Sequence, residues 1–380
     1  MSMTGQHQRC VGAMGLAATS MLAALLTPPA QAQTYTVLHR FTGADGARPA
    51  ATLIADPAGN LFGTTYAGGA SGYGTVFKLD KTGLTVLHSF TGGADGGTLL
   101  GGLVRDSAGN LYGTTESGGS GGMGTVFKLD ATGTETVLHS FAGGADGANP
   151  HAGLIRDAAG NLYGTTKFGG ASGDGVVFKL DKSGETVLHS FTGTDGAKPA
   201  AALIQDSAGN LYGTTSFGGA AGAGTVFKLD TAGTETVLYS FTGGADGSNP
   251  FGLIQDSSGN LYGTAIRGGI APGLSGYGVV FKLDAAGTES VLHSFSGGAD
   301  GGDTTASLVL DPAGNLYGTA PISGFSHGAG VVFKLEPAGT ENLLQTGIVF
   351  ELNKAGETVL NRFTGEFPGY PGAGRRPAQI

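Results

Sequence analysis

Short apolar runs separated by glycine- and aspartate-containing turns recur along almost the whole chain. In one stretch the runs are 102–105, 110–115, 124–129 and 135–141, and they are rich in Val, Phe, Tyr, Thr and Leu. Runs of this length and composition, bounded by turn residues, predict β-strands. No window repeats its apolar residues at the helical period of about 3.6 with capping residues at its ends, so almost no helix is expected.

One motif, Gly-Asn-Leu-aromatic-Gly-Thr, marks the period of this pattern. Its asparagines are Asn60, Asn110, Asn161, Asn210, Asn260 and Asn315, with steps of 50, 51, 49, 50 and 55 residues. Glycine is abundant, at 74 of 380 residues, but it follows the same period. A fixed period of this length indicates a tandem-repeat fold.

The connections between the runs are of two kinds. Asp106–Gly109 and Asp130–Gly133 are short and combine an aspartate with a glycine three residues later, which predicts tight hairpins. The loops 116–123 and 91–96 are longer and rich in glycine. In a four-stranded meander alternate connections fall on alternate edges, so we expect tight turns on one face of the protein and long loops on the other.

These observations predict an all-β fold, a β-propeller of six full four-stranded blades plus a partial seventh closing blade. The third run, Val126–Leu129, offers bulky groups to both sides, as expected for a sheet between two neighbours. The glycine in Asn-Leu-Tyr-Gly is expected to let adjacent backbones approach. A β-solenoid of parallel strands is the alternative fold.

The two ends of the repeat region suggest how the ring closes. Residues 35–41 match the fourth strand of a unit, whereas 347–353 and 357–363 match a third and a fourth strand. A seventh unit without its first half would account for both. Residues 35–41 and 357–363 would then both match the fourth strand of that one unit. Six blades followed by a tail remains the alternative.

The chain divides into residues 1–32, a signal peptide, residues 33–365, the propeller, and residues 366–380, a disordered tail. Arg9 is the only charged residue before position 33, an apolar stretch follows, and Ala30-Gln31-Ala32 is a typical cleavage site. A membrane anchor is the alternative, but the apolar run is shorter than the roughly 20 residues that a spanning helix needs. We therefore expect a secreted, periplasmic or cell-surface protein.

Charge and cysteine content exclude several classes of partner and site. The formal charge is −9, and loss of Arg9 makes the mature chain more acidic still. Nucleic acid and anionic membranes need a basic surface, so neither is an expected partner. Cys10 is the single cysteine and lies in the signal peptide, so no disulfide or thiolate metal site is expected in the mature chain.

Three residue types recur once per unit, and each has a structural and a functional interpretation. The histidines of the fourth run could be metal ligands, but equivalent residues lie far apart around a ring, so packing and hydrogen bonding are expected. The aspartates of the Gly-Ala-Asp-Gly loops are expected to hold turns, with weak calcium binding as the minority interpretation. The lysines of the third run are expected to pair with acidic turns. The histidines are His39, His88, His139, His189 and His293; the loop aspartates are Asp45, Asp95, Asp146, Asp195, Asp246 and Asp300; the lysines are Lys78, Lys128, Lys179, Lys228, Lys282 and Lys334.

Departures from the repeat cluster in the long loops, which places aromatic and charged side chains together on one face. Such a mixture is typical of binding surfaces. The alternative is loop drift without selection. The candidate binding residues are Tyr66, Tyr73, Glu116, Met123, Lys167, Phe168, Asp174, Phe217, Arg267, Tyr277, Phe325 and His327.

No nucleophile–base pair, phosphate loop or metal-ligand cluster emerges from the sequence, so no catalytic residue, metal or cofactor is assigned. We expect a monomeric binding or structural scaffold that holds a protein or glycan partner on its long-loop face. The alternative is a metal-dependent propeller hydrolase or lyase of the lactonase type, which requires acidic or amide side chains from several blades at one mouth of the channel.

The motifs DSAGNLYGTT, GGxxGxGTVFKLD and ETVLHSFTGGADG together resemble the GloVer tandem-repeat family of bacterial exported proteins, over about residues 34–365. The resemblance implies an extracellular or cell-surface repeat protein with a propeller-like fold. Many members of that family end in a sorting anchor, but this tail has no apolar run of that kind.

Overall fold

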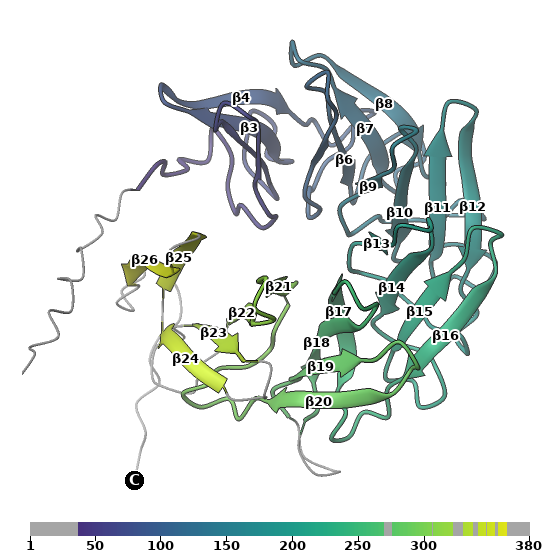
Figure 1. Cartoon of the computed structure of the whole chain (residues 1–380). Helices are drawn as coiled ribbons and strands as arrows, with labels where there is room; N and C mark the ends of the chain where they lie inside the picture. The colour runs from purple at the N-terminus through teal and green to yellow at the C-terminus, as the bar shows by residue number, and fades with distance from the viewer. Residues whose placement is uncertain are drawn as a thin grey trace, which may run out of the picture. The chain divides into compact units, whose positions relative to one another are not determined.

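All regular structure in the described part of the chain is β-strand (Figure 1). The computed structural model describes residues 37–269, 276–305, 307–321 and 330–336, together with the backbone of 341–346, 348–353 and 356–362. Within these residues there are six four-stranded antiparallel sheets, each with its strands in chain order. The expectation of an all-β chain is confirmed.

The six sheets follow one another along the chain, and each is a meander whose first strand is short except in the fifth sheet. The first three sheets are β1 (Ile54–Ala55), β2 (Leu61–Thr65), β3 (Thr75–Asp80) and β4 (Gly83–Ser89); β5 (Val104–Arg105), β6 (Leu111–Thr115), β7 (Thr125–Leu129) and β8 (Glu135–Ser140); and β9 (Ile155–Arg156), β10 (Leu162–Thr166), β11 (Val176–Asp181) and β12 (Gly184–Ser190). The last three are β13 (Ile204–Gln205), β14 (Leu211–Thr215), β15 (Thr225–Leu229) and β16 (Glu235–Ser240); β17 (Ser248–Gln255), β18 (Leu261–Arg267), β19 (Val279–Leu283) and β20 (Glu289–Ser294); and β21 (Val309–Leu310), β22 (Leu316–Ala320), β23 (Val331–Leu335) and β24 (Glu341–Thr346).

The short connections form hydrogen-bonded hairpin turns, as the sequence predicted. In the second sheet the Asp106 amide donates to Asn110 O, and Gly109 N donates to Asp106 O, at 3.0 and 3.1 Å. The Asp106 carboxylate accepts from Asn110 N, Asn110 Nδ2 and the Tyr112 hydroxyl. One side chain therefore fixes both the turn and the start of β6, which explains why Asp, Gly, Asn and Tyr recur together.

The glycine of the Asn-Leu-Tyr-Gly motif has a different role from the one expected. Gly113 pairs with Phe127 across β6 and β7, and a Cβ on Gly113 would lie 2.7 Å from the Phe127 ring and 3.0 Å from Leu103. The glycine therefore makes room for a phenylalanine side chain of its own sheet. The expected approach of adjacent backbones was wrong at this position.

Each sheet packs on the next through a separate apolar cluster. The core between the first two sheets joins Phe62 and Val76 to Phe90, Leu103 and Phe127. Similar clusters join the second to the third sheet, the third to the fourth, the fourth to the fifth and the fifth to the sixth. Phenylalanine pairs such as Phe90–Phe127, with ring centroids 5.0 Å apart in an edge-on arrangement, cross these junctions. Burial on both faces of each sheet explains the absence of clean polar alternation.

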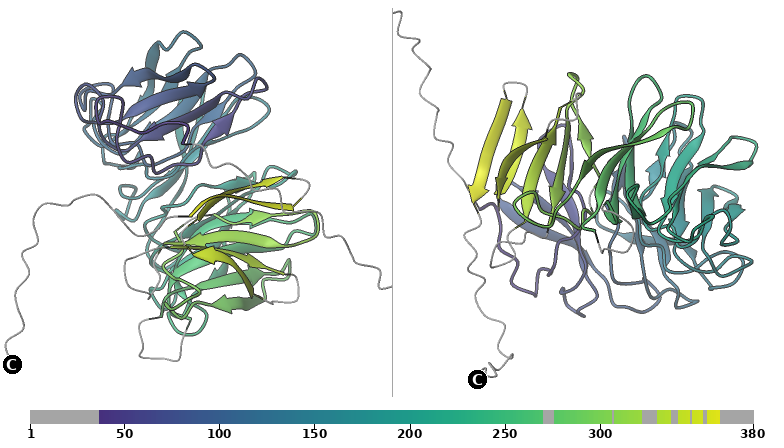
Figure 2. Two further views of the ribbon diagram at one scale, coloured as in Figure 1. Left: turned by 90° about the vertical axis from the view of Figure 1, so that its left-hand side faces the viewer. Right: turned by 90° about the horizontal axis from the view of Figure 1, so that it is seen from below.

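The six sheets follow one another around a ring (Figures 1 and 2). This arrangement, with a cavity that all six share, confirms the propeller. Residues of all six sheets line this cavity of about 530 Å³. Hydrogen bonds join the sheets beside it, for example from Thr114 Oγ1 to Ala152 O at 2.9 Å. A linear solenoid would not bring its first and sixth units to one cavity.

The two faces also differ as expected. Tight turns of the fourth and fifth sheets, around Asp206, Asp256 and Asp284, line one shared hollow. The long loops pair with one another elsewhere, as in the bridge between Gly97 and Ser117.

The seventh blade stays a prediction. β25 (Ile348–Asn353) and β26 (Gly356–Arg362) form a two-stranded antiparallel hairpin that pairs with no other described strand. Residues 37–41 form no strand, although the Phe41 ring packs edge-on against Phe77 at 5.2 Å, as Phe90 packs on Phe127. The expected signal peptide, 1–32, and tail, 366–380, lie outside the described residues.

Candidate functional site at the mouth of the central cavity

Small side chains dominate the wall of the central cavity, and larger ones occur at single positions. The innermost segments of neighbouring sheets touch there, since a Cβ on Gly101 would lie 2.6 Å from Gly153 N. The described lining residues are Ala50, Ala51, Thr52, Leu100, Gly101, Gly102, His151, Ala152, Gly153, Ala200, Ala201, Ala202, Ser216, Phe251, Ile266, Thr305 and Ser307. The larger residues His151, Phe251 and Ile266 make the mouth asymmetric.

Six residues with left-handed backbone lie at the entrances to the sheets, each two positions before a residue that lines the cavity. Their φ angles lie between 54° and 62°, a region that residues other than glycine adopt rarely, at a cost of about 1–2 kcal/mol each. They are Arg48, Thr98, Asn149, Lys198, Asn249 and Asp303. Their side chains differ at almost every copy, although the backbone conformation is the same.

Hydrogen bonds hold this left-handed conformation. Asn149 N donates to Met123 O of the second sheet at 2.8 Å, while Lys167 N of the third sheet donates to Asn149 O at 3.2 Å. The Asn149 side-chain amide also donates to Glu116 O at 2.9 Å. Thr98 and Lys198 make the same pair of bonds, so that three of the left-handed residues join the long loops of two successive sheets.

Glu116 and His151 form the first group of polar side chains at the mouth. His151 Nδ1 lies 3.5 Å from Glu116 Oε1, across the junction between the second and third sheets. Hydrogen bonding to His151 is the main cause that holds the pKa of Glu116 below its ordinary value, with a smaller contribution from the charge of Lys167. Both side chains are partly buried.

Phe168 and Phe217 form a second group, which extends over the third and fourth sheets. Their side chains are 38 % and 46 % exposed. Lys198 Nζ lies 5.6 Å from the Phe168 ring centroid and 5.2 Å from that of Phe217, and Lys167 Nζ lies 5.6 Å from Phe168. We call Lys167, Phe168, Lys198 and Phe217 the Phe–Lys patch. It combines exposed apolar rings with two positive charges.

The other predicted binding residues lie around the same ring of left-handed residues. The carbonyls of Tyr73, Met123, Asp174 and Tyr277 accept hydrogen bonds from the amides of Thr98, Asn149, Lys198 and Asp303. Tyr66 N donates to Arg48 O. Arg267 Nη1 lies 3.1 Å from Asp303 Oδ1, with an Arg267 side chain that is 55 % exposed. Phe325 and His327 lie outside the described residues.

Sequence reasoning missed Lys198, Asn249, Asp303 and His151. A signal was present in the sequence, because four of the six left-handed residues precede a proline, at Pro49, Pro150, Pro199 and Pro250. Their side chains also vary within otherwise repeated loops. The predicted binding residues that the structure describes all come from the end of the second strand of a sheet or the loop that follows it, whereas these four lie in or just before the first strand of a sheet.

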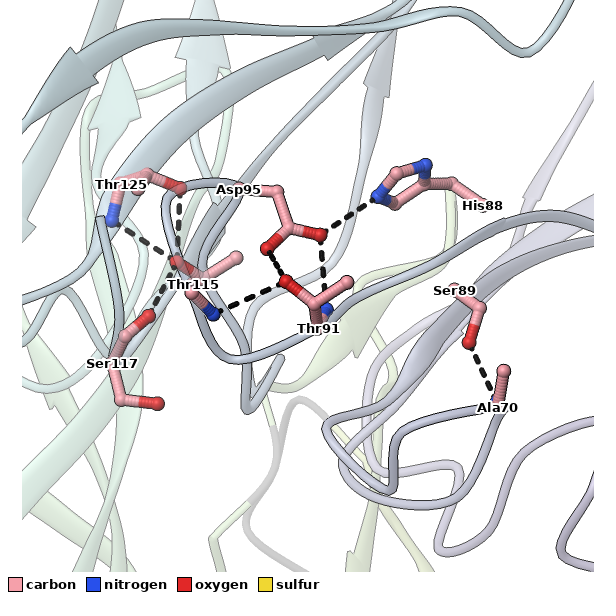
Figure 3. A network of polar contacts seen from close by, with 9 residues as sticks. Ala70, His88, Ser89, Thr91, Asp95, Thr115, Ser117 and Thr125 are labelled. Atoms are coloured by element: carbon pink, nitrogen blue, oxygen red, sulfur yellow. Dashed lines mark hydrogen bonds and ion pairs between the residues drawn. The ribbon is translucent and has the colours of Figure 1, made fainter. Parts of the chain in front are cut away.

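The recurring histidines and loop aspartates have the structural contacts expected of them. The lysines do so only in part, because Lys78, Lys179 and Lys334 pair with acidic residues, whereas Lys228 and Lys282 lie over the rings of Tyr212 and Tyr262. His88 Nε2 lies 3.3 Å from Asp95 Oδ2, and Asp95 also accepts from Thr91 N (Figure 3). Tyr239 takes the histidine position in one copy, and its hydroxyl donates to Asp246 at 3.1 Å. Lys78 Nζ lies 2.8 Å from Asp80, a residue of the tight turn.

A recurring glutamate lies near each of several loop aspartates. Glu135, at the start of β8, has its pKa raised to about 7 because burial disfavours its charged form and Asp95 repels it. Glu185, Glu235 and Glu289 have their pKa values raised to about 7 by the same causes, with Asp146, Asp195 and Asp246 as the repelling charges. These glutamates lie outside the cavity lining.

The lactonase-type alternative predicted acidic or amide side chains in the channel. The described lining residues include no carboxylate and no side-chain amide. The described part of the chain also contains no helix of the length and apolarity that a bilayer crossing requires.

The family comparison covers nearly the whole chain. The model of the Gloeobacter/Verrucomicrobia repeat matches residues 25–166 and 153–374. No curated protein sequence matches the chain.

Several solved structures resemble the chain at low identity. A puromycin-hydrolysing peptidase of Mycobacterium tuberculosis is 13% identical, with a TM-score of 0.50, over 79% of this chain and 44% of that one. A protein of Bacteroides uniformis assigned as a 6-phosphogluconolactonase is 20% identical, with a TM-score of 0.49, over 78% and 86%. A gluconolactonase of Xanthomonas campestris is 15% identical, with a TM-score of 0.40, over 69% and 82%. At these identities the likeness concerns the fold alone.

Proposed function

This chain belongs to the Gloeobacter/Verrucomicrobia repeat family, and from that premise we propose that it is an exported binding protein whose ligand contacts the mouth of the central cavity. The observation that supports this proposal is where the sequence differs from one repeat to the next. Turn, core and interblade positions repeat almost unchanged, whereas the left-handed ring holds Arg48, Thr98, Asn149, Lys198, Asn249 and Asp303. A rigid frame that presents different side chains at one rim is typical of a binding scaffold.

The Phe–Lys patch favours an acidic glycan as the ligand. Phe168 and Phe217 are exposed enough to contact the apolar face of a sugar ring, and the ammonium groups of Lys167 and Lys198 lie beside them. The chain as a whole is acidic, at −9, so the patch is a local positive region in an otherwise repelling field. A protein partner is the other outcome that the experiment below distinguishes.

The lactonase-type function is not proposed. It needs carboxylates or amides that converge on the cavity, and the described lining offers small, apolar and hydroxyl side chains with one histidine. The rim is the better supported location for a ligand.

An array of acidic and neutral glycans tests the proposal with the full chain and two rim variants, Phe217→Ala and Lys198→Asn. Asparagine is the natural residue at the Lys198 position in two other sheets, so the backbone tolerates it. Binding to acidic glycans should weaken by about 10-fold in each variant, which corresponds to about 1.4 kcal/mol.

Lys182→Ala is the matched control, because Lys182 lies in a tight turn and its loss changes the net charge equally. Acidic-glycan binding that the control weakens as much as the rim variants do would contradict a specific site. A blank array combined with rim-dependent capture of a protein would replace the glycan with a protein partner.

A further inference from the structure

A histidine, an aspartate and a glutamate meet at the junction of the third and fourth sheets, away from the cavity mouth. His189 is the penultimate residue of β12, Asp195 lies in the loop that follows, and Glu235 begins β16. One ligand atom from each lies within 4.8 Å of the others, and all three side chains are partly buried. His189 Nε2 is 3.0 Å from Asp195 Oδ2.

One oxygen of the Glu235 carboxylate lacks a partner in this arrangement, as do the matching oxygens of Glu135, Glu185 and Glu289. The Glu235 Oε1 atom is buried and accepts no hydrogen bond from any described residue. A buried, unpaired carboxylate oxygen is costly, and the nearby Asp195 adds repulsion when both groups are charged. A cation between them would satisfy the oxygen and neutralise both charges.

Asp195 is already oriented for such a role. Its Oδ1 accepts from Thr192 N and Thr192 Oγ1, at 2.8 and 3.0 Å, so that Oδ2 is directed toward His189. Hydrogen bonds of this kind fix the direction of ligating carboxylates in metal sites.

We propose that His189, Asp195 and Glu235 form a Zn²⁺ site that joins the third and fourth sheets. One imidazole nitrogen and two carboxylate oxygens are typical zinc ligands. Calcium takes six to eight oxygen ligands, so the histidine would not serve as one of them. Tetrahedral ligands about 2.1 Å from zinc are about 3.4 Å apart. His189 Nε2 and Asp195 Oδ2 are 3.0 Å apart, and no two of the three ligand atoms are more than 4.8 Å apart. Solvent supplies the fourth ligand, and the ion stabilises the junction.

The other junctions provide internal comparisons. The positions of His189, Asp195 and Glu235 correspond to Tyr239, Asp246 and Glu289 one unit later, where the imidazole is absent. Two further sets whose three side chains the structure describes have longer His–Asp distances, 3.3 Å for His88–Asp95 and 3.4 Å for His139–Asp146, and do not meet the same spacing. One tight site per chain is therefore expected.

Zinc titration of the tag-free, chelator-treated full chain, followed by elemental analysis after gel filtration, tests the site. The wild type should retain about one Zn²⁺ per chain, and His189→Tyr and Glu235→Gln should each weaken binding at least about 10-fold. Cobalt in place of zinc should give visible absorption bands that both variants lose.

Glu289→Gln is the control, because its junction carries Tyr239 in place of histidine, and its zinc content should equal that of the wild type. Melting curves without metal establish that each variant is folded, and added zinc should raise the melting temperature of the wild type and of Glu289→Gln only. The proposal fails if the wild type retains no more zinc than Glu235→Gln, or if all three variants lose zinc equally.

Discussion

His151 Nδ1 lies 3.5 Å from Glu116 Oε1, and no other junction whose side chains the structure describes has a histidine and a glutamate at these positions. The positions that match His151 hold Ala50, Leu100, Ala200, Phe251 and Thr305, and those that match Glu116 include Tyr66, Lys167, Ser216 and Ile266. The pair therefore marks one side of an otherwise repeated mouth.

Replacing His151 should raise the pKa of Glu116. Hydrogen bonding to His151 is the main cause of the lowered value, so His151→Ala should return it toward the ordinary range of a glutamate. Carbon-detected NMR titration of the Glu116 carboxyl measures the change. His189→Ala, at a different junction, should leave the Glu116 titration curve where it was; a shift there would mean a global effect instead of a local one.

Adding a methyl group at Gly113 should destabilise the protein. A Cβ there would lie 2.7 Å from the Phe127 ring, so Gly113→Ala forces the ring or the strand to move, at about 1–3 kcal/mol. Urea unfolding followed by circular dichroism measures the cost. Gly144→Ala is the control, since nothing lies within 4 Å of its Cβ, and it should be neutral or slightly stabilising. Equal losses in the two variants would contradict the packing role of Gly113.

Truncating Phe127 should cost far more than truncating Phe217. Phe127 is fully buried between the first two sheets, so Phe127→Ala is expected to lose about 3–5 kcal/mol of unfolding free energy. Phe217 is 46 % exposed, and Phe217→Ala should change stability by no more than about 0.5 kcal/mol. The same unfolding experiment ranks the two, and a cost for Phe217 as large as that for Phe127 would show that the rim supports the fold.

Stability of the metal-free protein should fall as the pH rises from about 4.5 to about 7. Glu135, Glu185, Glu235 and Glu289 keep their protons up to a pKa of about 7 in the folded state, whereas unfolded glutamates lose them near 4.5. Their contribution is thus complete below pH 4.5 and is lost as the pH passes the folded value.

Denaturation midpoints in the presence of a chelator, measured across this pH range, reveal the slope. Glu185→Gln removes one titrating group and should make the slope shallower. A midpoint that Glu185→Gln leaves equally dependent on pH would argue that Glu185 titrates normally.

The sequence determined the unit, the strands within it and the tight turns, because these depend on contacts between residues close in the chain. Asp106, Gly109, Asn110 and Tyr112 lie within seven positions of one another and form their hydrogen bonds locally, so their spacing is sufficient to predict the turn. The bulky side chains of Val126–Leu129 also predicted that both faces of each sheet are buried.

Only the tertiary structure decided which variable residues meet. His151 and Glu116 are 35 positions apart, and Phe168, Lys198 and Phe217 come from loops of two sheets, so the packing of successive sheets brings them together. The same packing places Glu235 beside His189 and Asp195. Local spacing carries no information on how one sheet packs on the next.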